Sequence, residues 1–97
     1  MTKFNKVIEK NIERLEQFVP IVDRVHGGSH PEFKDVHKLF DKINAKIKET
    51  ESEKPEIDNE FKELRKVTNN YTVPGDVCES YEAVYNMLSE LDEAYNI

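Results

Sequence analysis

The chain has 97 residues, of which 37% are hydrophobic and 35% are charged, and its net charge at pH 7 is −6. This length suits one domain, over residues 1–97. The acidic balance argues against a nucleic acid partner, because phosphates attract an excess of Lys and Arg. No run approaches the ~20 apolar residues of a membrane span, and residues 1–6 lack the apolar segment of a signal peptide. The single cysteine, Cys78, fits a reducing compartment, so we expect a cytoplasmic protein.

The first predicted helix covers residues 3–26. Apolar residues recur there at steps of three and four: Ile8, Ile12, Leu15, Val19 and Val22. Pro20 lies off this stripe, where it removes one backbone hydrogen bond and bends the helix. A turn, VHGGSHPE, follows at residues 25–32. Its glycines are predicted to take the left-handed conformation that ends a helix, and Ser29 with Glu32 to form a capping box.

Three further helices are predicted, at residues 30–52, 55–71 and 76–96. Pro55 separates the second from the third, because it disfavours a helical conformation at the residue before it. The apolar stripes of these two helices nevertheless keep one phase, so a single kinked helix from 30 to 70 is the alternative. Asp76 with Glu79 has the spacing of a cap at the start of the last helix.

This pattern predicts an all-α fold, an up-down-up-down four-helix bundle with short connections. The residues expected in its core are the large apolar members of the stripes: Leu15, Phe40, Phe61, Leu64, Leu88 and Leu91.

Three histidines and one cysteine are the candidate reactive residues. His26 and His30 flank the glycine turn, and with Glu32 they form a candidate zinc site, while His37 lies two helical turns further on. We expect structural roles for all three and no metal or cofactor, because a cationic imidazole suits the end of a helix. Cys78, in the first turn of a predicted helix, is a candidate reactive thiol, but we expect a small buried apolar residue. No nucleophile elbow, HExxH or phosphate-binding glycine loop occurs, so no enzyme is predicted.

Two stretches of the chain resemble the RIC family, hemerythrin-like di-iron proteins linked to the repair of iron–sulfur clusters. The first joins VHG at 25–27 to HPEF at 30–33, and the second is LRKVTNNYT at 64–72, followed by Pro74, Asp76, Cys78 and Tyr85. The second is more specific, because a generic bundle does not require its Thr-Asn-Asn, Pro and Cys spacing. The resemblance implies a hemerythrin-like bundle and a function in iron–sulfur cluster repair, stress response or iron handling.

The resemblance implies a di-iron site only where the family's ligands are present. Its first-helix His falls at Asn5, its second-helix His and Glu at Thr50 and Lys54, its third-helix His also at Lys54, and its fourth at position 98, beyond the 97 residues. His26 matches a family histidine but lies ~31 Å along a helix from position 5. Because iron sites of this class need imidazole and carboxylate, we expect a degenerate metal site and a protein that acts by binding.

In an antiparallel bundle, residues 1–5, 50–55 and 95–97 lie at one end. The last apolar layers there are predicted to be partly exposed and to bind a protein partner or a second copy of the chain: Phe4, Ile8, Ile47, Ile57 and Tyr95. A monomer is the competing outcome. The other hypotheses are a generic protein–protein interaction module of unrelated function, a thiol activity at Cys78, and a metal site rebuilt across a dimer from Glu49, Glu51, Glu53 or Glu56.

Overall fold

The computed structural model describes residues 3–49 and 56–96 of the chain. In these ranges the chain forms four helices and no strand: α1 (Lys3–His26), α2 (Glu32–Glu49), α3 (Asp58–Val67) and α4 (Glu79–Tyr95). The all-α prediction with four helices is therefore confirmed, and so are the predicted bounds of the first helix. The up-down-up-down order and the hemerythrin-like relationship stay predictions. Within the same ranges, no helix is long and apolar enough to cross a membrane.

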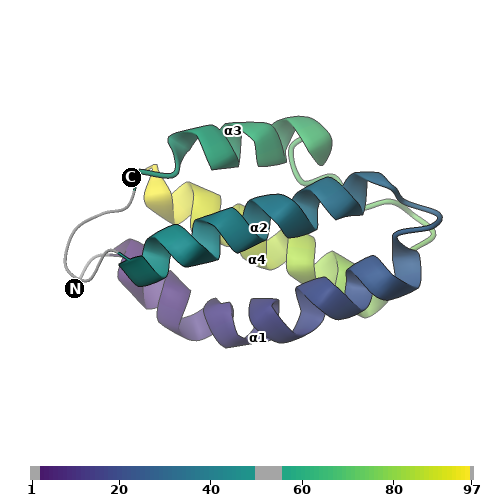
Figure 1. Ribbon diagram of the computed structural model, residues 1–97, viewed down its shortest axis with the longest axis horizontal. Helices are drawn as coiled ribbons and strands as arrows, with labels where there is room; N and C mark the ends of the chain where they lie inside the picture. Colours follow the sequence, from purple (N-terminus) through teal and green to yellow (C-terminus); the bar gives the residue numbers. More distant parts are fainter. Residues whose placement is uncertain (1–2, 50–55, 97) are drawn as a thin grey trace.

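The helices pack side by side along the length of the molecule (Figure 1). α1 packs against α4 and α2, and α2 packs against α3. This last contact requires the chain to fold back between the two helices, and the Lys46 ammonium donates to the Glu60 carboxylate across it at 3.0 Å. The alternative of one helix from 30 to 70 is therefore wrong. The predicted break at residues 52–55 lies outside the described residues.

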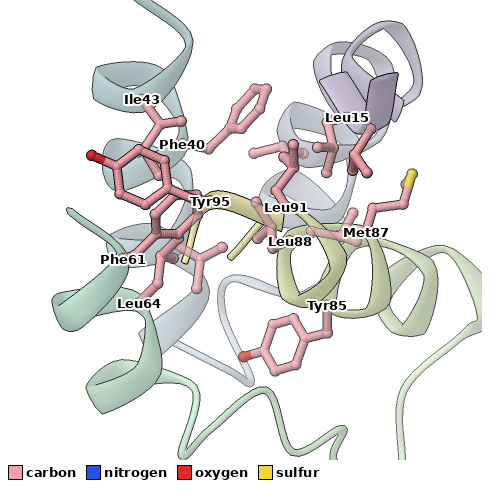
Figure 2. Packing of buried hydrophobic residues seen from close by; sticks show 14 of the residues in the cluster. Leu15, Phe40, Ile43, Phe61, Leu64, Tyr85, Met87, Leu88, Leu91 and Tyr95 are labelled. Carbon is pink, nitrogen blue, oxygen red and sulfur yellow. The ribbon is translucent and has the colours of Figure 1, made fainter. Parts of the chain in front are cut away.

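Apolar side chains from all four helices fill one core (Figure 2). The six residues expected in the core are all buried: Leu15, Phe40, Phe61, Leu64, Leu88 and Leu91. Each such side chain contributes roughly 1.5–3 kcal/mol when it leaves water. α4 carries the largest share of buried residues, including Tyr81 and Tyr85, and so contributes more to the core than any other helix of the described ranges.

The buried row in the first half of α1 differs from the predicted stripe. Val7 and Asn11 face the core, whereas Ile8 and Ile12 are half-buried. The row of Phe4, Val7 and Asn11 is buried in place of the predicted one because it faces α4. There the Phe4 ring packs edge-on against Tyr95, with ring centroids 5.2 Å apart. The Asn11 amide donates to the Glu90 carboxylate at 3.2 Å, which satisfies a polar group in this row.

The predicted ends of the other helices are wrong by a few residues. α2 begins at Glu32 rather than 30, and α3 begins at Asp58 rather than 55. α3 also ends at Val67, before the predicted 71, because the next residues leave the right-handed helical region. α4 begins at Glu79 rather than 76, with Cys78 as its N-cap residue.

The glycine turn closes in a different way from the one predicted. No glycine has a positive φ, so the left-handed conformation expected of Gly27 or Gly28 is wrong. Instead the His26 carbonyl accepts from the backbone N–H groups of Ser29 at 3.0 Å and His30 at 2.7 Å. A glycine is needed at 27 for space, because an added Cβ would overlap the carbonyl oxygen of Asp23, whereas an added Cβ at Gly28 meets nothing within 4 Å.

Candidate functional site

The packing of α1 against α4 brings Cys78 and His26 into contact. His26 is the last residue of α1, and Cys78 directly precedes α4. The His26 Nε2 and Cys78 Sγ atoms are 3.1 Å apart, which is within hydrogen-bond distance for sulfur. Cys78 is exposed, so its expected role as a small buried residue is wrong. An exposed thiol beside an imidazole is the arrangement of a nucleophile and its general base.

His30 lies in the same cluster but pairs with carboxylates. Its Nδ1 is 3.1 Å from Glu32 Oε1, and its Nε2 is 3.2 Å from Asp76 Oδ1. The predicted caps at Ser29 and Asp76 are wrong, because α2 begins only at Glu32 and the N-cap residue of α4 is Cys78. Glu32 and Asp76 instead meet this imidazole. The predicted structural role of His30 fits these contacts, which tie the start of α2 to the loop before α4.

The ring of Tyr81 contacts the imidazole rings of both His26 and His30. The rings of His26 and His30 pack edge-on against it, with centroids 5.6 and 5.5 Å away. Its hydroxyl lies 3.1 Å from the Tyr85 hydroxyl and 3.4 Å from Glu32 Oε1. Burial, followed by the Tyr85 hydrogen bond, raises the pKa of Tyr81 well above its usual range. Tyr81 therefore stays a neutral phenol, and its ring packs against both histidines.

His37 lies apart from this cluster and pairs with aspartates. Its Nδ1 is 2.7 Å from Asp23 Oδ2, and its Nε2 is 3.5 Å from Asp41 Oδ2. The hydrogen bond from His37 is the main cause that lowers the pKa of Asp23. The sequence does not point to Asp23 as a partner of His37, because nothing in a helical stripe links two residues on different helices.

The described residues hold no group of three or more His, Cys, Asp or Glu side chains placed to bind a metal ion. Of the acidic residues proposed to rebuild a metal site across a dimer, Glu49 and Glu56 are exposed. Glu51 and Glu53 lie outside the described residues. The metal-free state of the protein stays a prediction.

The proposed association surface at the other end of the bundle is less exposed than predicted. Ile8 and Ile47 are half-buried, but Phe4, Ile57 and Tyr95 are buried, so the expected exposure of these three is wrong. They cover one another, because the Tyr95 ring packs against Phe4 and its hydroxyl accepts from the Ile57 backbone N–H at 3.1 Å. Whether this end binds a partner stays a prediction.

The large apolar side chains that are exposed in the described ranges lie elsewhere, on α1. They are Ile21, with 45% of its surface exposed, and Val25, with 63%. The two are four residues apart and so occupy adjacent turns on one side of the helix. Neither residue belongs to the apolar stripe predicted for this helix, so periodicity alone does not point to them.

Comparisons of the chain with protein-family models, with curated proteins and with solved structures found no match.

Proposed function

We propose that this chain is a RIC-related helical protein that takes part in iron–sulfur cluster repair or iron handling by binding, without a di-iron site of its own. The support is the motif resemblance at residues 25–33 and 64–85, together with Asn5 in place of the family's first histidine. The alternative is a helical interaction module of unrelated function. Both hypotheses require a surface through which the chain binds a partner. The partner we propose is a second copy of this chain.

The observation that carries the binding proposal is the exposed pair Ile21 and Val25. They stand out because the described core otherwise buries or half-buries its large apolar side chains. Half-buried Phe18 lies one turn before Ile21, which extends the apolar strip along α1. Exposed apolar patches of this kind favour association, since contact with a second copy removes them from water.

Light scattering of the wild type, Val25→Glu and Ile47→Glu tests this proposal. We expect a dimer mass for the wild type and for Ile47→Glu, and a monomer mass for Val25→Glu at the same concentration. Circular dichroism of each variant checks that the helices are retained. A wild type with monomer mass at every concentration contradicts the proposal. Loss of the dimer in Ile47→Glu alone would assign association to the opposite end of the bundle.

A thiol activity at Cys78 is the second candidate function, and the 3.1 Å contact with His26 favours it. In the proposed step, His26 Nε2 accepts the thiol proton while Cys78 Sγ attacks one sulfur of a small disulfide. A new S–S bond forms to Cys78, the original S–S bond breaks, and the departing thiolate takes the proton.

The rate of reaction with dithiodipyridine, an aromatic disulfide, tests the second candidate. We expect His26→Asn to slow the reaction about tenfold or more, because the thiol loses its base. His37→Asn is the matched control, since His37 contacts Asp23 and Asp41 rather than Cys78. Equal rates for the wild type and His26→Asn would refute a role for the pair.

A further inference from the structure

A buried carboxylate on α4 is surrounded by donors from three segments of the chain. The Asp92 side chain is 7% exposed. It accepts from Arg65 Nε at 2.8 Å and Nη2 at 3.1 Å, from the Tyr71 hydroxyl at 2.7 Å, and from Asn96 Nδ2 at 2.7 Å. These charge-assisted bonds compensate the buried charge and fix the positions of the three donors.

Tyr71, one of these donors, has a strained backbone conformation, and so do the two residues before it. Asn69, Asn70 and Tyr71 have φ values of 53°, 58° and 60°, a region that a bulky residue such as Tyr rarely adopts. The Asn70 N–H donates to the Arg65 carbonyl at 2.7 Å, and the Tyr71 N–H donates to Thr68 Oγ1 at 2.8 Å. Strain of this kind is concentrated at ligand sites and switches. It also falls within the Thr-Asn-Asn-Tyr stretch, which a generic bundle does not require.

Two of the strained residues, Asn70 and Tyr71, line a pocket of about 370 Å³ between the end of α3 and the last turns of α4. Arg65, Asn70 and Tyr71 line one part of it, and Ser89 and Glu93 line another. Its volume is in the range of small-molecule sites. The strained loop thus places Asn70 and Tyr71 beside this pocket, together with Arg65.

We propose that this pocket binds a small α-amino acid, independently of the proposed association through α1. Arg65 uses Nε and Nη2 for Asp92, so Nη1 is left to donate to a ligand carboxylate, with the exposed Asn70 amide as a second donor. The exposed Glu93 carboxylate accepts from the ligand's ammonium group. An α-amino acid places its carboxylate at Arg65 and its ammonium group at Glu93. A simple anion is repelled by Glu93 and by Asp92, which also lines the pocket, and a simple cation makes only the contact with Glu93, because Asp92 already neutralises Arg65.

Titration of the ¹⁵N-labelled protein with L-alanine, followed by NMR, tests the proposal. We expect saturable shifts of the amides of Asn70, Tyr71, Ser89 and Glu93, and none with sodium acetate or ethylammonium chloride. Asn70→Gly and Glu93→Gln should each weaken binding at least about fivefold, because each removes one polar contact.

Asn69→Gly is the matched control, since glycine tolerates the left-handed conformation and residue 69 does not line the pocket. It should bind L-alanine as the wild type does. The proposal is overturned if L-alanine gives no saturable shifts, if acetate alone reproduces them, or if Asn70→Gly and Glu93→Gln bind with unchanged affinity.

Discussion

Replacement of the two neighbouring glycines of the α1–α2 turn separates the effect of space from the effect of backbone freedom. Neither glycine has a positive φ, so the backbone conformation does not exclude alanine at either position. Each Gly→Ala change stabilises the fold by roughly 0.4–1 kcal/mol, because the unfolded chain loses freedom. At Gly27, however, the new Cβ overlaps the Asp23 carbonyl oxygen, which lies within α1 and has little room to move.

The steric cost at Gly27 is about 1–3 kcal/mol, as for other overpacked sites. Because the entropic gain is common to both variants, Gly27→Ala should be less stable than Gly28→Ala by about this amount, or roughly 4–8 °C in Tm per kcal/mol. Urea denaturation of the two variants and the wild type measures the difference. Equal stability of the two variants would refute the close approach at Gly27.

Three further predictions concern the core and its polar contacts. Leu88→Ala should cost ~2–5 kcal/mol in a urea titration, since the side chain is fully buried; a loss below ~0.5 kcal/mol would contradict this packing. Because the His37 hydrogen bond holds the pKa of Asp23 below its usual 3.8, Asp23 stabilises the fold above that pH. This contribution is lost as the pH falls through the pKa that Asp23 has in the folded protein. Asp23→Asn should therefore remove this part of the pH dependence of the free energy of unfolding. Tyr71→Phe should cost ~1–3 kcal/mol by thermal denaturation, because buried Asp92 loses a donor; an unchanged Tm would show that water replaces it.

Helical periodicity was sufficient to predict the four helices and their core, because a buried stripe must recur every three or four residues. It could not choose between adjacent apolar rows in the first half of α1. There Val7 and Ile8 are both apolar, and the contact between Phe4 and Tyr95 decides which row faces α4. Local patterns also misplaced the left-handed residues. These residues are Asn69, Asn70 and Tyr71, and none of them is a glycine. The hydroxyl of Tyr71 donates a hydrogen bond to Asp92, a contact between distant residues that no local pattern predicts.

The candidate sites were harder to predict than the fold. His26 and Cys78 were each identified as candidate reactive residues, but they are 52 residues apart in the chain, and no spacing rule joins them. Their contact follows from the packing of α1 against α4, which brings the end of one helix to the start of the other. The same limit applies to Asp92, whose donors Arg65 and Tyr71 belong to other segments.

The iron content of the untagged protein tests most directly the central claim of the proposed function, that the chain acts without a di-iron site of its own. The claim predicts far less than one iron per chain by elemental analysis, including for any dimer isolated by gel filtration. Two irons per chain would contradict it. A stoichiometric metal found only in the dimer would instead support a site rebuilt between two copies, to which Glu49 and Glu56 are the described candidate contributors.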